Sequence, residues 1–401
     1  MSKSGFRTFP AHIQAIVRVV QSVFTTGVRP DRALMLEFQR LGRPGARDRA
    51  VVAETSYNLI RHWRLWWHLM EAPPATGETQ LKKLVLNYLD LLHQLNENAM
   101  SLEFWLVEQK KLCPPAVYYS VPDVVWQLGL DQLEQDWEVE VAAQNSPSLP
   151  HLRVNSLKAL PEVVVKKLSE ESVITRPHEK FPDVLVVQRQ GRNIFSTRAF
   201  REGWIELQDA GSQEVGRFAA PQPGDRVVDA CAGAGGKTLH MAALMGNKGR
   251  ILSLDVDPRK LHELRRRSSR AGVQIVETRS VENRKILKRL LGTADLVLVD
   301  APCTGSGTWR RNPDLKYRLS EAWLQRCTQT QHTLLRQYAA LVKPGGRLVY
   351  ATCSILPDEN QNQWQRFLED HPTFEHLESR HILPSRHACD GFFMAAARRK
   401  E

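Results

Sequence analysis

Two cysteines follow apolar stretches that the sequence predicts to be buried strands. Cys303 ends the stretch ADLVLVDAPC, and Cys353 lies in the stretch GRLVYATCS. A thiolate is a strong nucleophile that can bond covalently to a substrate. A free cysteine is usually a small buried hydrophobe. Two cysteines at the ends of two neighbouring strands of the chain instead indicate reactive chemistry.

The other cysteines form no recognisable metal or disulfide pattern. No C-x-x-C pair occurs, and no cysteine is spaced with histidine as zinc ligands are. We therefore expect no metal site and no disulfide framework. Cys113, Cys327 and Cys389 are expected to be buried thiols.

From residue 224 onward, the expected elements alternate between strand and helix. The strands are expected at 225–233, 249–256, 273–279, 294–303 and 346–354. The helices are expected near 237–245, 258–271, 281–291 and 320–341. This alternation predicts a doubly wound, mostly parallel sheet that is buried on both faces. Ligands of such α/β folds bind beyond the carboxyl ends of the strands, where both cysteines are expected.

Three carboxylates and a Gly-rich turn share this expected edge. Asp229, Asp255 and Asp300 each end a strand, and DACAGAGGKT (229–238) joins the first strand to a helix. The turn fits neither the phosphate-loop spacing nor the dinucleotide G-x-G-x-x-G spacing. A turn that approaches a nucleoside closely, with Asp255 for the ribose hydroxyls, fits S-adenosylmethionine. A nicotinamide enzyme or another nucleotide enzyme stays open as the alternative.

The N-terminal part of the chain has a different pattern. Three stretches have the apolar spacing of helices: 11–26, 47–70 and 80–93. The segment QNSPSLP (144–150) has the composition of a linker. We expect an all-helical domain over 1–144, a small α+β connecting subdomain over 145–210, and the α/β domain over 211–401. No signal peptide or membrane span is recognisable, so we expect a cytoplasmic protein, and we expect a monomer.

Positive charge is concentrated in the α/β domain. The chain carries 55 Lys and Arg against 44 Asp and Glu, a net charge of +11. Residues 258–289 alone hold 11 basic and 3 acidic side chains. This excess favours a polyanionic partner such as nucleic acid. A solvated basic face that aids solubility is the alternative.

Several motifs resemble those of the RsmB/NSUN-type RNA (cytosine-5)-methyltransferases. The segments concerned are DACAGAGGKT, DAPCTGSGTWRRNPD, YATCSILPDEN, FREGWIELQDAGSQEV and DGFFMAAARRK. The segment GARDRAVVAETSYNLIRHW resembles the NusB-like helical domain of the bacterial members. The resemblance implies a Rossmann-like class I methyltransferase domain, preceded by an all-α NusB-like domain and the small connecting subdomain. It also implies an RNA substrate, with ribosomal RNA as the first choice and transfer RNA as the second.

The resemblance implies a role for each matching residue. Cys353 would be the nucleophile, Cys303 would assist release, and Asp300 would contact the cytosine ring. Lys237 would position that carboxylate or the cofactor end of the site. The implied cofactor-binding residues are Ala230, Cys231, Ala232, Gly233, Ala234, Gly235, Gly236, Lys237, Asp255, Ser280 and Asp300.

Two positions depart from the family pattern. The turn usually reads A-A-P-G-G-K, whereas AGAGGK (232–237) keeps the glycines and lacks the proline. The family usually has an Asp near the adenine after the third strand, whereas Ser280 or Glu282 lies in that region here. Ser280 is expected to hydrogen-bond in its place.

A thiolate reaches a ring carbon only when the base is unstacked, so we expect residues that hold neighbouring nucleotides. Trp309, Arg310 and Arg311 follow the P-C motif and are expected to stack on or clamp these nucleotides, with Trp309 packed inward as the alternative. The arginines expected to contact phosphates lie on one predicted helix: Arg265, Arg266, Arg267 and Arg270.

Two other classes of function stay open. One is a methyltransferase that acts on another atom, which would tolerate the loss of both thiols. The other is an RNA-binding assembly factor with a vestigial site, which would not bind S-adenosylmethionine. The presence of Cys303, Cys353, Asp300 and Lys237 argues against a vestigial site.

Overall fold

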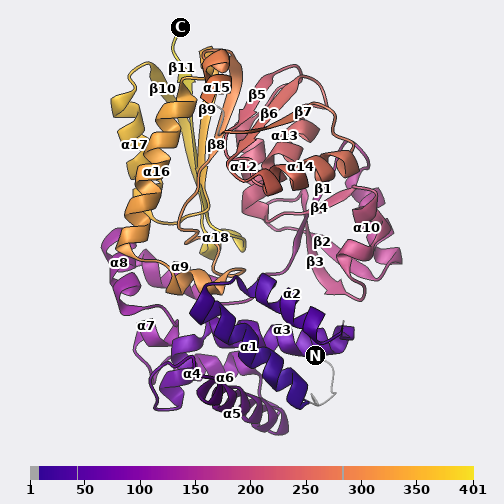
Figure 1. Ribbon diagram of the computed structural model, residues 1–401, viewed down its shortest axis with the longest axis vertical. Coiled ribbons are helices and arrows are strands. Elements are labelled where there is room, and N and C mark those ends of the chain that lie inside the picture. The colour runs from indigo at the N-terminus through magenta and orange to yellow at the C-terminus, as the bar shows by residue number, and fades with distance from the viewer. Residues whose placement is uncertain (1–8, 43, 282–283) are drawn as a thin grey trace. The chain divides into compact units, whose positions relative to one another are not determined.

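The computed structural model describes residues 9–42, 44–281 and 284–401, and its chain divides into two compact units (Figure 1). The first, here called the helical unit, comprises Met1–Asn145 and Trp309–Ser320. The second, called the sheet unit, comprises Ser146–Thr308 and Glu321–Glu401. The three-domain division expected from the sequence stays a prediction, since residues 146–210 group with the sheet unit.

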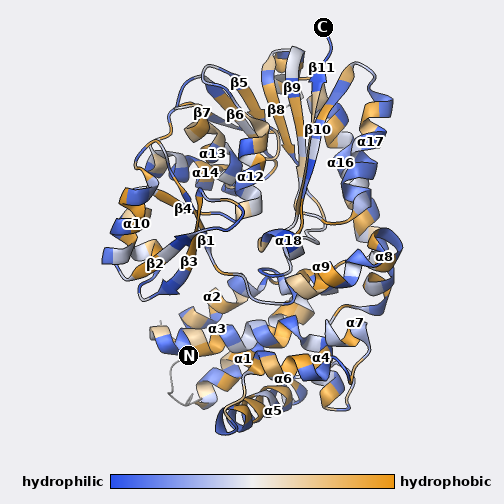
Figure 2. Ribbon diagram, turned by 180° about the vertical axis from the view of Figure 1, so that it is seen from behind, coloured by the Kyte–Doolittle hydropathy of each residue, from blue (hydrophilic) through white to orange (hydrophobic). Residues whose placement is uncertain are grey.

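Nine helices form the described N-terminal part of the helical unit. They are α1 (Pro10–Thr26), α2 (Pro30–Arg40), α3 (Ala46–Arg61), α4 (Trp63–Leu69), α5 (Glu78–Glu97), α6 (Leu102–Gln109), α7 (Pro115–Tyr118), α8 (Asp123–Leu133) and α9 (Asp136–Gln144). The apolar faces of α1, α3, α4 and α5 make one core, and hydrophobic and hydrophilic residues alternate along these helices (Figure 2). Trp63, Trp66 and Trp67 are buried in this core.

A segment from the C-terminal half of the sequence completes the helical unit. It contains the 3-10 helix η2 (Pro313–Tyr317), and its Lys316 is 1% exposed. The Lys316 Nζ donates to the carbonyl oxygen of Arg61 at 2.7 Å and to that of Tyr119 at 2.9 Å. It also donates to the Oδ1 of Asn145 at 2.9 Å. One ammonium group therefore ties the segment to three separate parts of the N-terminal helices.

The sheet unit begins with a small antiparallel sheet in the order β2-β3-β1-β4. Its strands are β1 (His151–Val154), β2 (Val173–Pro177), β3 (Val184–Gln190) and β4 (Ile205–Leu207). The helical segments beside it are α10 (Pro161–Glu170), η1 (Ile194–Ser196) and α11 (Arg198–Arg201). This sheet has its own apolar core, around Leu152, Val164 and Leu185. We call it the small sheet.

A seven-stranded sheet follows in the order β10-β11-β9-β8-β5-β6-β7. Its strands are β5 (Arg226–Asp229), β6 (Arg250–Asp255), β7 (Val276–Ser280), β8 (Ala294–Asp300), β9 (Val342–Thr352), β10 (Phe374–Ile382) and β11 (Phe392–Arg399). Neighbouring strands from β5 to β9 pair in parallel, whereas β10 and β11 pair antiparallel. This arrangement confirms the expected Rossmann-like α/β fold, which follows an all-helical N-terminal region in the sequence.

Helices cover both faces of this sheet. On one face lie α12 (Ala210–Ala219), α13 (Gly236–Leu244) and α14 (Pro258–Ala271), and on the other lie α16 (Glu321–Ala339) and α17 (Gln361–Asp370). The other helical segments of this part of the chain are α15 (Arg284–Leu290), α18 (Pro384–His387) and the 3-10 helix η3 (Pro357–Glu359). None of the helices in the described residues is long and apolar enough to cross a membrane.

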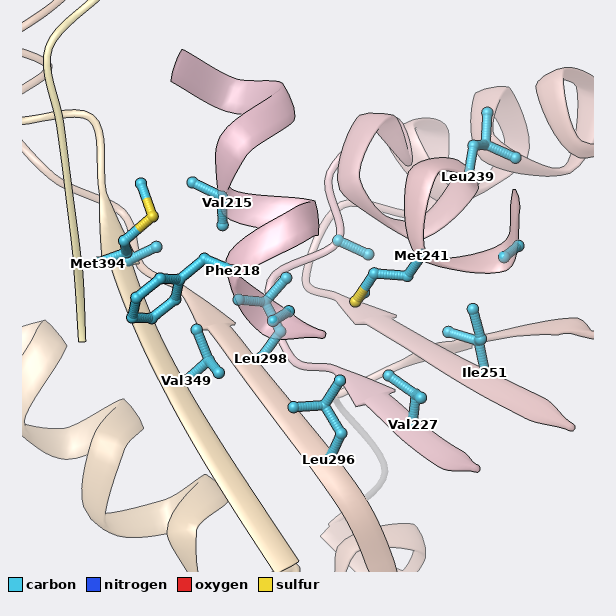
Figure 3. Packing of buried hydrophobic residues seen from close by; sticks show 14 of the residues in the cluster. Val215, Phe218, Val227, Leu239, Met241, Ile251, Leu296, Leu298, Val349 and Met394 are labelled. Carbon is cyan, nitrogen blue, oxygen red and sulfur yellow. The ribbon is translucent and has the colours of Figure 1, made fainter. Parts of the chain in front are cut away.

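Adjacent residues of one strand contribute to two different cores. Val227 packs with Phe218, Met241 and Leu298 on one face of the sheet (Figure 3), and Val228 packs into the core of the other face. Because side chains alternate between faces, a strand buried on both must be apolar throughout. This explains the short apolar runs in the sequence. Polar side chains are excluded from the buried strands, so they occur where the strands end.

Replacing Lys316 by methionine should destabilise the helical unit. Three buried acceptors would lose their donor, so the free energy of unfolding should fall by about 2 kcal/mol or more. Urea unfolding of the full chain measures this change. Lys111→Met, at a side chain that is 74% exposed in the same unit, is the matched control and should have little effect. Equal effects of the two substitutions would contradict the structural role of Lys316.

Candidate active site at the carboxyl ends of the strands

The two thiols meet where β8 and β9 end. The register pairs Asp300 with Ala351, so Cys303 and Cys353 emerge from adjacent parallel strands. Their Sγ atoms are 3.4 Å apart, and both side chains are partly buried. The hydrogen bond with Cys353, together with burial, raises the pKa of Cys303 well above its ordinary value. Cys303 therefore holds its proton at neutral pH, and the two sulfur atoms lie within hydrogen-bond distance of each other.

An ion pair lies beside the thiols. The Lys237 Nζ is 2.7 Å from the Oδ2 of Asp300, and both side chains are largely buried. Burial disfavours the charged form of Lys237, but Asp300 and then Cys353 outweigh it, so the pKa of Lys237 is raised. The ammonium group therefore stays charged.

Glu359 holds the segment that carries Cys303. Its Oε1 accepts from the backbone N–H of Thr304 at 2.8 Å, and its Oε2 accepts from the Thr304 hydroxyl at 2.5 Å. The Nε2 of Gln331 donates to both Glu359 and the carbonyl of Pro302, each at 3.0 Å. Glu359 is fully buried, and burial raises its pKa. These bonds fix the backbone on both sides of Cys303.

The next residue, Asn360, holds the segment that carries Cys353. Its Oδ1 accepts from the Thr352 hydroxyl at 2.6 Å, and its Nδ2 donates to the carbonyl of Ser354 at 3.0 Å. The hydroxyls of Ser306 and Ser354, 2.8 Å apart, join the two segments directly. Two adjacent residues thus set the path of both cysteine segments. Sequence reasoning did not assign Glu359 or Asn360 a role, although both lie in the motif YATCSILPDEN.

The Gly-rich turn lies at the same edge, against the end of β6. The Oδ2 of Asp255 accepts from the N–H of Gly233 at 2.8 Å, and its Oδ1 accepts from the N–H of Asp257 at 2.8 Å. Gly235 has a φ of +86°, and a Cβ there would lie 2.0 Å from the Cδ1 of Leu264. Glycine is therefore required where the turn enters α13.

The residues at this edge fit the adenosine end of S-adenosylmethionine. Asp255 is opposite Ser280 in the β6–β7 register. The buried Ser280 hydroxyl has no hydrogen-bond partner within the described residues, and each Asp255 oxygen can accept a further bond. Asp255 can therefore hold the ribose hydroxyls, and Ser280 supplies a polar group for the base. Glu282, the alternative to Ser280, lies outside the described residues.

Residues 217–398 match the family model described as 16S rRNA methyltransferase RsmB/F. A relative from Synechocystis, named "Probable ribosomal RNA small subunit methyltransferase B", is 34% identical over 80% of this chain and 75% of its own length. The chain belongs to the RsmB/F methyltransferase family.

Two solved structures have a similar fold. The crystal structure of PH0851 is 27% identical, with a TM-score of 0.79 over 99% of this chain and 100% of that one. A methyltransferase homologue from Pyrococcus horikoshii is 30% identical, with a TM-score of 0.60 over 69% of this chain and 98% of that one. S-adenosylmethionine is the cofactor of this class of enzyme, and the turn with Asp255 has the groups that would hold it.

Trp309, Arg310 and Arg311 belong to the helical unit. Trp309 is 1% exposed, and its ring centre is 5.7 Å from that of Trp137. The expectation that Trp309 stacks on a nucleotide was therefore wrong, since its ring is in the core of that unit. Arg310 is partly buried and Arg311 is exposed.

The four arginines of α14 divide into two pairs. Arg265 and Arg266 are exposed, and they contact Thr278 and Glu263 respectively. Arg267 and Arg270 are 15% and 18% exposed, and both form ion pairs with the buried Glu206. An internal carboxylate already binds both, so the prediction that Arg267 and Arg270 contact phosphates stays a prediction with less to support it than for Arg265 and Arg266.

Asp229, at the end of β5, is 1% exposed, and its Oδ2 accepts from the Thr238 hydroxyl at 2.6 Å. Burial, which outweighs this bond, raises its pKa to about 7, and the nearby Asp300 adds to the shift. The folded protein therefore binds a proton at Asp229 far more tightly than the unfolded chain does. This stabilisation is complete below about pH 4 and is lost as the pH rises through about 7.

Asp229→Asn should weaken the pH dependence of stability. The free energy of unfolding of the wild-type protein should fall, relative to that of the variant, by on the order of a few kcal/mol between acidic and alkaline pH. Urea unfolding of the cofactor-free proteins, in steps between about pH 5 and pH 8.5, measures this difference. Parallel curves for the two proteins would contradict the shifted pKa.

Proposed function

We propose that this protein transfers a methyl group from S-adenosylmethionine to carbon-5 of a cytosine in ribosomal RNA. The observation that supports this proposal most directly is the pair of thiols, 3.4 Å apart, beside the cofactor turn and the Lys237–Asp300 ion pair. A methyltransferase acting on an oxygen or an amino nitrogen needs no nucleophilic thiol. The names of the curated relatives support ribosomal RNA as the substrate.

Carbon-5 of cytosine is a poor nucleophile, and this explains the need for a thiolate. The Cys353 sulfur adds to carbon-6, which makes the ring an enamine that is nucleophilic at carbon-5. Bound S-adenosylmethionine supplies the electrophilic methyl group. Lys237 stabilises the thiolate before attack. Ring nitrogen-3 takes up a proton from the Lys237–Asp300 pair as the thiolate attacks, so that the ring carries no full negative charge, and this proton returns to the pair when the thiolate leaves.

Cys303 acts after the methyl group is in place. Formation of the bond between the Cys353 sulfur and carbon-6 removes the first cause of the raised pKa of Cys303. Cys303 can then lose its thiol proton to solvent and accept the proton of carbon-5. The electron pair released at carbon-5 re-forms the ring double bond and expels the Cys353 sulfur as a thiolate. Atoms and charge balance, and both thiols return to their initial states.

The cytosine must be unstacked before Cys353 can reach it, so its neighbours need to be held. Arg265 and Arg266 are exposed on α14 and are our candidates for phosphate contacts. Arg311, exposed in the segment after the P-C motif, is a third. Contacts of this kind add affinity without reading sequence.

A trapping experiment tests the two thiol roles. Cys303→Ala, mixed with total cellular RNA and S-adenosylmethionine, should accumulate a protein–RNA adduct that survives a denaturing gel, because release is blocked. Cys353→Ala should form none. Cys113→Ala, in the helical unit, is the control and should behave as the wild-type protein does. Sequencing of the trapped RNA identifies the target cytosine.

The other outcomes of this experiment are equally informative. An adduct with Cys353→Ala instead would exchange the two roles. Methyl transfer to RNA without an adduct from either variant would remove covalent catalysis at cytosine from the proposal.

A further inference from the structure

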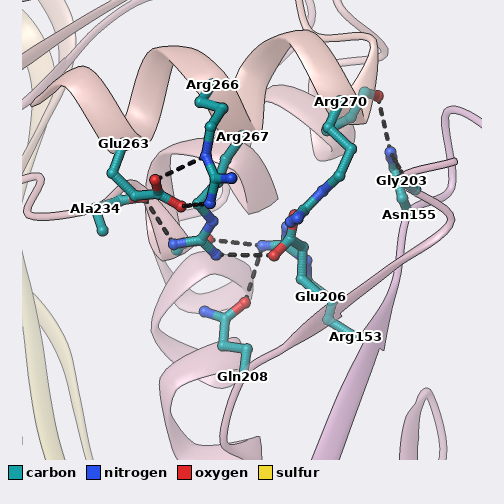
Figure 4. A network of polar contacts seen from close by, with 12 residues as sticks. Arg153, Asn155, Gly203, Glu206, Gln208, Ala234, Glu263, Arg266, Arg267 and Arg270 are labelled. Carbon is teal, nitrogen blue, oxygen red and sulfur yellow. Dashed lines mark hydrogen bonds and ion pairs between the residues drawn. The ribbon is translucent and has the colours of Figure 1, made fainter. Parts of the chain in front are cut away.

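A buried charge cluster lies between the small sheet and α14, and the proposed chemistry does not use it (Figure 4). Its centre is Glu206 of β4, which is 3% exposed. The Nη2 of Arg267 is 3.0 Å from the Oε2 of Glu206, and Arg270 contacts the Oε1. Arg153 of β1 is opposite Glu206 in the β1–β4 register. Burial lowers the pKa of Arg153 to about 9, so the neighbouring carboxylate helps to keep it charged.

Two arginines of this cluster donate into the cofactor turn. The Nη1 of Arg267 is 2.7 Å from the carbonyl oxygen of Ala234. The Nη1 of Arg153 is 2.7 Å from the carbonyl oxygen of Gly236 and 2.9 Å from the Oε1 of Gln208. The two carbonyls flank Gly235. Charged donors, one from α14 and one from the small sheet, thus hold the turn on either side of its most constrained residue.

The C-terminal end of α14 is fixed to the small sheet, so Arg267 has little freedom to move. The Nδ2 of Asn155 donates to the carbonyls of Gly203 and Ala271, at 2.8 and 2.9 Å. Gly203 has a φ of +74°, and a Cβ there would be 2.1 Å from the carbonyl oxygen of Arg270. Because Gly203 allows this close approach, the helix and the small sheet hold one position relative to each other.

The turn itself contains little that fixes its shape. Gly233 and Gly235 have positive φ values of 55° and 86°, and the residue between them is Ala234, not a proline. A Cβ at Gly233 would meet nothing within 4 Å, so nothing packs against the turn there. A chain with two glycines samples many conformations unless other groups restrain it. The restraint comes from the groups that bind its backbone: Asp255 at the N–H of Gly233, and the two arginines at the carbonyl oxygens of Ala234 and Gly236.

We infer that Arg267 and Arg153 are positioning residues of the cofactor site. They hold the carbonyls of Ala234 and Gly236, and thereby keep the turn in the conformation that binds S-adenosylmethionine. Glu206 holds Arg267 in place for this role. The small sheet then stabilises the cofactor site, in addition to connecting parts of the chain. This inference concerns cofactor affinity alone, so it is independent of which atom of the substrate is methylated.

Arg267→Met and Arg270→Met provide a matched comparison in the full-length protein. Each removes one ion pair to Glu206, but only Arg267 contacts the turn. Without RNA, calorimetry should show S-adenosylmethionine binding about tenfold more weakly to Arg267→Met, the loss expected for one charge-assisted hydrogen bond. Arg270→Met should bind within about twofold of the wild-type protein, while the thermal unfolding midpoints of the two variants fall by similar amounts.

Arg267→Lys extends the test if the methionine variant does not fold. Lysine keeps a positive charge for Glu206 but cannot present two planar donors to two acceptors, so affinity should lie between those of the wild-type protein and Arg267→Met. Equal losses of affinity in Arg267→Met and Arg270→Met would overturn the inference, since the cluster would then act only through stability. Unchanged affinity in both Arg267 variants would also overturn it. Failure of the thiol roles would appear only in the trapping assay.

Discussion

The active site depends on the parallel pairing of β8 with β9 at the centre of the large sheet. Asp300 is opposite Ala351, so chain segments fifty residues apart end at the same height. This pairing brings Cys303 and Cys353 to 3.4 Å, a separation that neither segment could set by itself. The apolar residues on both faces of the strands keep the pairing in register, because a shift by one residue would turn every side chain to the opposite face. The position of the two thiols is therefore a consequence of how the two cores are packed.

The charges at the strand ends balance one another in a way that suits a cationic ligand. Lys237 neutralises Asp300, and Asp229 has a pKa of about 7, so it is only partly ionised at neutral pH. The carboxylate of Asp255 accepts hydrogen bonds from the backbone N–H groups of Gly233 and Asp257. A positive sulfonium group near this edge would favour the ionised form of Asp229. Cofactor binding and proton release from Asp229 should thus be linked, since both follow from the same electrostatic field.

The sequence predicted the parts of the site that lie at strand ends. Cys303, Cys353, Asp255 and Asp300 follow apolar runs, and the fold rule for parallel sheets places such residues together. It could not assign Arg267 and Arg270, because a run of arginines looks the same whether it faces solvent or a buried carboxylate contributed by a distant strand. Trp309 was misjudged for the same reason, since its partner Trp137 is 172 positions away. β10 and β11 were not expected as strands, and the alanines of β11 carry little strand signal.

The motif DAPCTGSGTWRRNPD is continuous in sequence but not in structure. Its first nine residues, through Thr308, belong to the sheet unit, and from Trp309 onward the chain belongs to the helical unit. There the backbone N–H of Trp309 donates to the Oε1 of Gln144 at 3.0 Å, and Arg61 donates to the carbonyl of Arg310 at 2.8 Å. Only residues 304–308 separate Cys303 from these bonds. The N-terminal helices thus hold the segment that follows Thr308, whereas Thr304 and Ser306 are held within the sheet unit by Glu359 and Ser354.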